Sequence, residues 1–159
     1  HKNSHTYICI HTLPALLLIT TMRQMKFNIV KSDLKKKIWI VDDDRVIGNI
    51  ICDYFRANTL HEPYYFSCVP DATKALKSQT PDIMLLDWIM PEISGLDFLI
   101  HLRQNKNTKN LPIFMLTGLK SGLEFEHACN AADLNGYFTK PVNLPLMARR
   151  IEYHFAETV

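Results

Sequence analysis

The sequence predicts an α/β fold in which five parallel strands alternate with five helices in a sheet covered on both faces. Three observations lead to this prediction. Short apolar runs of strand length recur from residue 36 onwards and alternate with segments of helical spacing. Two of the runs, Ile38–Val41 and Ile83–Leu86, are apolar at every position, as in strands with helices on both faces. Strands that alternate with helices need right-handed crossovers, which make the sheet mostly parallel.

The first two strands and the first two helices are expected between residues 38 and 76. After the first strand, Asp44 is the expected N-cap of a helix. This helix carries an apolar stripe that would face the sheet, made of Ile47, Ile50, Ile51 and Tyr54. The aromatic and β-branched segment Pro63–Val69 predicts the second strand. Asp71 is the expected N-cap of a short helix whose inward residues are Ala72, Ala75 and Leu76.

Three further strands and three helices complete the pattern. The strands are expected at residues 83–86, 112–116 and 136–139. A helix near Ser94–Gln104 follows the loop that contains Pro91. Ser121 and Glu124 have the spacing of a capping box, which would open a helix through residues 129–133. Asn143 is the expected cap of the last helix, whose inward residues are Leu144, Met147, Ile151 and Phe155.

Charge divides the chain into a basic leader and an acidic body. Residues 1–37 carry seven basic side chains and one acidic one, whereas residues 38–159 carry 11 basic and 15 acidic ones. An acidic body argues against nucleic-acid binding by this domain, which would need clustered positive charge. The length of 159 residues and the 47% hydrophobic content suit a single core. We therefore expect one domain over residues 36–157.

Residues 1–35 are expected to be an N-terminal extension outside the fold. Their apolar segment is interrupted by polar residues and is shorter than the roughly 20 apolar residues that span a bilayer, so a membrane role is not favoured. A weak anchor for a membrane or a partner is the alternative, and Met22 or Met25 is the expected true start. The four cysteines are far apart and form no CxxC pair, which favours reduced thiols and a cytoplasmic location.

Polar residues follow four of the expected strands at their carboxyl ends. Asp42 and Asp43 follow the first strand, Asp87 the third, Thr117 the fourth and Lys140 the fifth. The carboxyl ends of parallel strands meet at one edge of the sheet, where ligands bind in folds of this class. We therefore expect these five side chains to converge.

This group of side chains suits phosphoryl chemistry. Crowded carboxylates repel one another, and Mg²⁺ relieves that repulsion through oxygen ligands. A carboxylate beside Mg²⁺ and a lysine is placed to attack phosphorus and form an aspartyl phosphate. Thr117 and Lys140 would then bind the phosphoryl oxygens. The chain has no GxGxxG or GxxxxGK[ST] loop, so the phosphoryl group must come from another molecule.

Four motifs resemble the receiver domain of two-component response regulators. They are VDDD at 41–44, LLDWIMP at 85–91, LTG at 116–118 and GYFTKP at 136–141. They occur in the order and spacing of that family over roughly residues 36–155. The resemblance implies a flavodoxin-like (βα)5 three-layer sandwich with the strand order 2-1-3-4-5.

The resemblance also implies the roles of individual residues. Asp87 would be the phosphoacceptor, with Thr117 and Lys140 in contact with the phosphoryl group. Mg²⁺ would be bound by Asp42, Asp43, Asp87 and the backbone carbonyl of Ile89, with Asp43 a direct ligand and Asp42 acting through water. Each residue also has a plainer interpretation: Asp87 as a turn residue, Thr117 as a strand-end cap and Lys140 as a surface charge.

Two further roles concern switching and lifetime. By resemblance, Tyr137 would be the aromatic switch that moves together with Thr117, although a tyrosine there is otherwise an ordinary strand residue. Ile89 and Leu119 lie two residues after Asp87 and Thr117 and cannot hydrogen-bond an attacking water. Their apolar side chains predict slow self-dephosphorylation.

The expected function is a signalling phosphoacceptor that catalyses only its own phosphorylation and dephosphorylation. A sensor histidine kinase or a histidine phosphotransfer protein would donate the phosphoryl group. A downstream protein would recognise the surface of the fourth helix, fifth strand and fifth helix. The chain could equally be the receiver fragment of a longer regulator with an output domain.

Two other classes of protein fit the sequence less well. A phosphatase of haloacid-dehalogenase type also uses an Asp at a strand end, but its acidic pair follows the lysine. No acidic residue follows Lys140 at a strand end here. A flavodoxin-like nucleotide-binding module would not need Lys140 or the acidic cluster.

Overall fold

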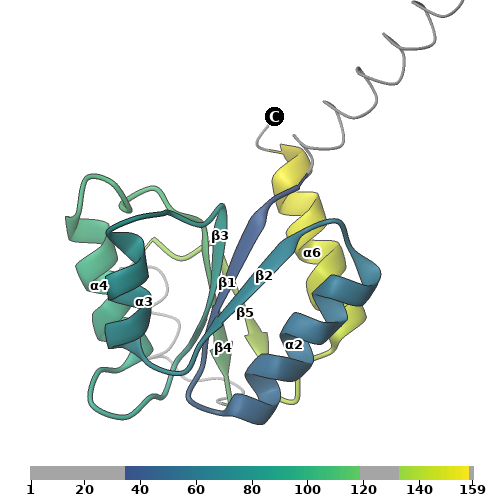
Figure 1. Cartoon of the computed structure of the whole chain (residues 1–159), viewed down its shortest axis with the longest axis horizontal. Helices are drawn as coiled ribbons and strands as arrows, with labels where there is room; N and C mark the ends of the chain where they lie inside the picture. Colours follow the sequence, from purple (N-terminus) through teal and green to yellow (C-terminus); the bar gives the residue numbers. More distant parts are fainter. Residues whose placement is uncertain (1–34, 119–132, 158–159) are drawn as a thin grey trace, which may run out of the picture. The chain divides into compact units, whose positions relative to one another are not determined.

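Five parallel strands form one sheet in the order β2-β1-β3-β4-β5 in the computed structural model, which describes residues 35–118 and 133–157. The strands are β1 (Lys37–Val41), β2 (Glu62–Phe66), β3 (Ile83–Asp87), β4 (Ile113–Thr117) and β5 (Gly136–Thr139). The helices, labelled as in Figure 1, are α2 (Arg45–Asn58), α3 (Val69–Leu76), α4 (Gly95–Gln104) and α6 (Leu144–Glu157). The predicted strand order is confirmed.

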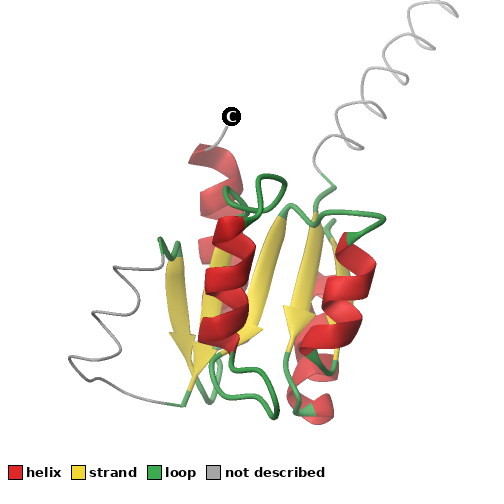
Figure 2. Ribbon diagram, turned by 90° about the vertical axis from the view of Figure 1, so that its left-hand side faces the viewer, coloured by secondary structure: helices red, strands yellow, loops and turns green. Residues whose placement is uncertain are grey.

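Helices cover both faces of this sheet, as predicted. Helices α2 and α6 lie on one face, and α3 and α4 lie on the other (Figure 1). The strands all point the same way, so their carboxyl ends meet at one edge (Figure 2). The described part of the fold is therefore a three-layer sandwich. The helix expected between Ser121 and Asp133 lies almost wholly outside the described residues.

The two faces of the sheet have separate hydrophobic cores. Trp39 and Val41 of β1 pack with α3 and α4, whereas Ile38 and Ile40 pack with α2 and α6. Alternate residues of a strand point to opposite faces, so a strand with two cores has no position left for a polar side chain. This is why β1 and β3 read as unbroken apolar runs.

Two predicted helix caps, Asp44 and Asn143, are confirmed, and the structure adds a third at Ser94. The Asp44 side chain accepts hydrogen bonds from the backbone N–H groups of Val46 and Ile47 at 2.9 and 3.2 Å. Ser94 caps α4 in the same way, and Asn143 accepts from the N–H at the start of α6. These side chains satisfy N–H groups that have no partner within their helices.

The predicted boundary between the second strand and the second helix is wrong. Strand β2 ends at Phe66 instead of Val69, because α3 already begins at Val69 with Cys68 as its N-cap residue. Pro70 lies in the first turn, where its missing N–H has no intrahelical partner to lose. Asp71 is therefore a first-turn acid near the positive end of the helix dipole and not the cap.

The predicted inward stripe of α2 is only partly right. Its buried residues are Gly48, Ile51, Cys52 and Phe55. Ile51 is buried as predicted, but Ile50 is 50% exposed. The helix is turned because Gly48, which has no side chain, faces the ring of Tyr65 on β2.

The described helices and cysteines show no feature of a membrane-spanning or disulfide-bonded chain. None of the helices in residues 35–118 and 133–157 has the length and apolarity needed to cross a bilayer. Cys52 and Cys68, the two cysteines in these ranges, are free thiols. The chain divides into two units, residues 1–35 and residues 36–159.

Replacing Gly95 by alanine should destabilise the fold. A Cβ at Gly95 would overlap the backbone carbonyl oxygen of Asp87, and the Gly95 N–H donates to the Trp88 carbonyl at 3.1 Å. We expect Gly95→Ala to lower the free energy of unfolding by about 1–3 kcal/mol, as overpacking does. Denaturant unfolding measures this. Gly118→Ala is the matched control, because a Cβ at Gly118 meets nothing within 4 Å.

An equal effect of the two substitutions would contradict this account of Gly95. Alanine at an unstrained glycine position with free space stabilises or changes little, because it restricts the unfolded chain. The backbone at Gly118 has no positive φ, so this control is a fair one.

Candidate functional site

A lysine and two buried carboxylates meet at the carboxyl edge of the sheet. The Lys140 ammonium, after β5, lies 2.8 Å from Asp42 Oδ2 and 3.0 Å from Asp87 Oδ1. Asp42 follows β1 and is fully buried, and Asp87 ends β3 with 5% of its surface exposed. Three strand ends that are far apart in the sequence thus form one ion-paired cluster.

Backbone hydrogen bonds place the two acids. The Asp42 N–H donates to the Phe66 carbonyl at 3.1 Å, which continues the β1–β2 ladder by one residue. The Asp42 carboxylate accepts from the Asp44 N–H at 2.9 Å. After Asp87, the Trp88 N–H donates to the Leu116 carbonyl at 2.8 Å. The acids therefore lie on continuations of strands and not on free loops.

The opposite side of the cluster is anchored through β4. The Lys140 N–H donates to the Thr117 carbonyl at 2.7 Å, and the Lys140–Pro141 peptide bond is cis. Thr117 is fully buried at the end of β4, directly between the ends of β3 and β5 in the sheet. The Lys140 side chain therefore passes the end of β4 to reach the two acids.

Burial sets the protonation of these groups. Desolvation raises the pKa of Asp87 to about 6, although its hydrogen bond with Lys140 acts the other way. Desolvation also raises the pKa of Asp42. For Lys140, burial disfavours the ammonium, but its hydrogen bonds to both acids outweigh this and raise its pKa. A single lysine thus does not compensate the desolvation of both carboxylates.

Three carboxylates at this edge could bind a cation. Asp42, Asp43 and Asp87 each offer an oxygen within 4.8 Å of the others. Hard carboxylate oxygens are the ligands of Mg²⁺, and a net excess of buried negative charge favours a divalent ion. The donor set therefore fits Mg²⁺, the cofactor expected from the sequence.

Of the remaining predicted residues, the structure describes Ile89 and Tyr137. Ile89 has a side chain that is 65% exposed, on the loop after Asp87. Tyr137 is 45% exposed on β5, next to Met115 of β4. Leu119 lies outside the described residues. The structure thus brings together the three acids and Lys140, with Thr117 beside them.

Sequence reasoning missed Tyr65. Its hydroxyl donates a hydrogen bond of 2.8 Å to the backbone carbonyl of Asp42. Burial and the nearby acid Asp42 both raise the pKa of this phenol. The one available signal was Gly48, because a glycine inside a helical pattern often has a packing reason.

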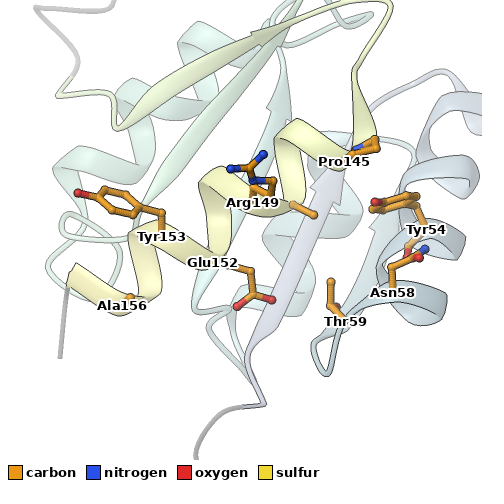
Figure 3. A pocket seen from close by; sticks show the side chains of 9 residues that line it. Tyr54, Asn58, Thr59, Pro145, Arg149, Glu152, Tyr153 and Ala156 are labelled. Atoms are coloured by element: carbon orange, nitrogen blue, oxygen red, sulfur yellow. The ribbon is translucent and has the colours of Figure 1, made fainter.

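A separate groove lies between α2 and α6, away from the acidic cluster. It encloses about 640 Å³, and Figure 3 shows its lining side chains. One of them, Glu152, has a carboxylate oxygen 3.0 Å from Nε2 of the buried His61. Its lining residues are Tyr54, Asn58, Thr59, Pro145, Ala148, Arg149, Glu152, Tyr153 and Ala156. None of the predicted site residues is among them.

Comparison with known proteins agrees with this fold. The response regulator receiver domain family matches residues 38–152. Chemotaxis protein CheY of Pseudomonas aeruginosa is 32% identical over 123 residues, which cover 75% of this chain and 95% of that protein. The chain therefore belongs to the response regulator receiver domain family, a family of signalling domains.

Two further relatives show how such domains occur. Phosphate regulon transcriptional regulatory protein PhoB of Escherichia coli is 27% identical over 129 residues, covering 75% of this chain. The chain spans about half the length of the PhoB proteins that it matches. The receiver domain of Francisella response regulator 1452 is 25% identical, with a TM-score of 0.70 over 78% of this chain and 99% of that one.

The raised pKa of Asp87 predicts a pH-dependent stability in the absence of metal. The pKa of Asp87 is about 6 in the folded chain, above its ordinary value of 3.8, so the folded state binds this proton more tightly than the unfolded chain does. The stability that this proton contributes is present near pH 4 and is lost as the pH rises through about 6. Asp87→Asn removes the titration. The variant should therefore gain stability relative to the unmodified chain by up to about 3 kcal/mol between about pH 4 and pH 8.

Denaturant unfolding in EDTA at several pH values measures this difference. Asp53→Asn is the control, because the Asp53 side chain is 75% exposed and should give a nearly constant difference. A difference for Asp87→Asn that is equally flat would show that the Asp87 carboxylate is not destabilised by burial.

Proposed function

We propose that this chain is a phosphoacceptor receiver that takes a phosphoryl group onto Asp87 in a Mg²⁺-dependent reaction. The donor would be a phosphohistidine on a sensor histidine kinase or on a histidine phosphotransfer protein. The observation that carries the proposal is the buried Asp87 carboxylate, 3.0 Å from Lys140 within a cluster of three acids. The chain would catalyse only its own phosphorylation and dephosphorylation.

In the proposed reaction a carboxylate oxygen of Asp87 attacks phosphorus. The O–P bond forms as the N–P bond of the phosphohistidine breaks, and the imidazole nitrogen leaves with the electron pair and takes up a proton. Lys140 and the Thr117 hydroxyl stabilise the charge on the phosphoryl oxygens. Asp42, Asp43, Asp87 and the Ile89 carbonyl would hold Mg²⁺. When bound, Mg²⁺ supplies further neutralisation of that charge.

Lys140 links the reaction to the rest of the domain. Its ammonium now pairs with Asp42 and Asp87, and phosphoryl oxygens on Asp87 would compete for it. The backbone of Lys140 is hydrogen-bonded to Thr117, so a change there reaches both β4 and β5. We propose that Thr117 moves towards the phosphoryl group and that Tyr137 turns inward with it. A partner protein would then recognise the surface of the domain's fourth helix, β5 and α6.

The limits and setting of the domain are part of the proposal. We assign residues 36–157 to the receiver and residues 1–35 to an extension outside it, which the family match at residues 38–152 supports. The similarity to CheY suits a stand-alone receiver, and that to PhoB suits the receiver of a longer regulator. The two free thiols support a reducing, cytoplasmic setting. The acidic body supports a protein partner and not nucleic acid.

Asp87→Asn should abolish phosphorylation. An amide cannot act as the nucleophile that forms an acyl phosphate, so incubation with acetyl phosphate and Mg²⁺ should give no increase in mass by intact mass spectrometry. Asp53→Asn is the matched control and should be labelled like the unmodified chain, because this carboxylate is exposed and pairs with Arg56. Labelling that survives in Asp87→Asn would place the acceptor elsewhere.

Ile89→Asn should shorten the lifetime of the phosphorylated form. The exposed Ile89 side chain cannot orient a water, whereas an amide at this position could donate or accept one hydrogen bond to it. One hydrogen bond corresponds to an acceleration of about two- to tenfold. Loss of label after removal of the donor measures the rate.

The control for this substitution is Ile100→Asn on α4, where the isoleucine is 44% exposed. It makes the same chemical change on a helix surface and should leave the rate unaltered. Equal lifetimes for Ile89→Asn and the unmodified chain would remove Ile89 from the residues that set the lifetime.

A further inference from the structure

Tyr65 connects strand β2 to the acidic loop after β1. Its hydroxyl donates to the backbone carbonyl of Asp42 at 2.8 Å, across 23 residues of sequence. The ring lies on the α2 face of the sheet and packs against the core that contains Ile40 and Ile51. The adjacent Tyr64 packs against the opposite core, so Tyr65 is the one of the two that faces this loop.

Gly48 provides the space for the Tyr65 ring. A Cβ at Gly48 would overlap the Cε2 and Cδ2 atoms of that ring. Glycine is an unfavourable residue in the interior of a helix, and Gly48 lies in the first turns of α2. Helix α2 is therefore intrinsically less stable at Gly48, the position that the Tyr65 ring packs against. Gly48 and Tyr65 therefore form a matched pair across the α2–β2 contact.

The hydrogen bond acts on the peptide unit between Asp42 and Asp43. The Asp42 carbonyl and the Asp43 N–H belong to the same rigid plane, so a donor on the carbonyl limits rotation of the whole unit. The orientation of this plane decides the direction in which the Asp43 side chain leaves the backbone. Two further hydrogen bonds hold Asp42 itself in place: its N–H donates to the Phe66 carbonyl, and its carboxylate accepts from the Asp44 N–H.

Asp43 depends on this backbone more than the other two acids do. Asp42 and Asp87 are buried and pair with Lys140, whereas Asp43 is exposed and forms no ion pair with Lys140 among the described residues. Its carboxylate nevertheless offers an oxygen within 4.8 Å of the other two. The direction of the backbone is therefore what brings this exposed acid to the cluster.

We propose that Tyr65 is a positioning residue for the divalent cation: its hydroxyl fixes the Asp42–Asp43 peptide so that the Asp43 carboxylate faces the site, and Gly48 makes room for its ring. This inference rests on the proposed function only in taking the three acids as the Mg²⁺ site. A phenol suits this task because it is a neutral donor. A lysine or arginine in its place would fix the loop but would compete with the cation for the carboxylates.

A Mg²⁺ titration of the full chain by calorimetry tests the proposal. Tyr65→Phe keeps the ring and removes only the hydroxyl, so it should weaken Mg²⁺ binding by about three- to tenfold, the range expected for one hydrogen bond. Tyr64→Phe is the matched control, because it removes a hydroxyl from the same strand. That hydroxyl donates to Glu62 at 3.1 Å, away from the acidic loop, so Mg²⁺ binding should be unchanged.

Gly48→Ala provides a second, independent variant. Alanine raises helix propensity but displaces the Tyr65 ring, so it should weaken Mg²⁺ binding even where the helix becomes more stable. In a Tyr65→Ala background the same substitution should have no further effect on Mg²⁺ binding. This double-mutant cycle separates two effects of the substitutions. Loss of Asp43 positioning would weaken Mg²⁺ binding, whereas a general loss of packing would change only the free energy of unfolding.

Two negative results have different meanings. If the unmodified chain binds Mg²⁺ and Tyr65→Phe binds it equally well, the positioning role is wrong and the proposed function stands. If the unmodified chain binds no Mg²⁺ but is still labelled on Asp87, the metal assignment is wrong and this inference falls with it.

Discussion

The contact of one lysine with two buried carboxylates is the interaction on which the site depends. Lys140 comes from the end of β5, whereas Asp42 and Asp87 come from the ends of the adjacent strands β1 and β3. The lysine therefore has to extend past the end of β4 to reach them. A long flexible side chain can do this, and a Cβ at Gly118, after Thr117, would meet no atom of the described residues within 4 Å. The strand order, which places β4 between β3 and β5, thus requires a side chain as long as lysine at position 140.

This ion-paired cluster leaves an excess of negative charge. One ammonium lies beside three carboxylates, two of them buried, and burial together with the neighbouring acids raises the pKa of Asp87. A fold selected for stability alone would replace such a group with apolar residues, since buried ion pairs are weakly stabilising at best. The cluster therefore makes physical sense as a site for a cation and an incoming phosphoryl group. The excess negative charge would bind the cation, and the cation together with Lys140 would then bind the anionic phosphoryl group.

Local patterns predicted the strands and the site better than the contacts between elements. The acids after β1 and β3 and the lysine after β5 follow directly from where apolar runs end. The start of α3 was mispredicted because Val69 continues the apolar pattern of β2 although Pro70 favours the helix. The face of α2 was mispredicted because a helical stripe counts large side chains, whereas this helix buries Gly48. Gly48 was the one sequence signal for Tyr65, and it does not identify the partner, since the role of Tyr65 depends on a contact 23 residues away.

Two glycines allow close contacts to the backbone of the two buried acids. Gly95 lets the start of α4 approach the backbone of Asp87, and Gly48 lets Tyr65 reach the backbone of Asp42. In both places the main chain that carries an acid is fixed by neutral contacts and not by the charges of the site. We therefore expect a change of charge there to leave β1 and β3 in place. In the proposed mechanism the movement must therefore occur on the β4–β5 side, where Lys140 and Thr117 meet the phosphoryl group and Tyr137 lies exposed.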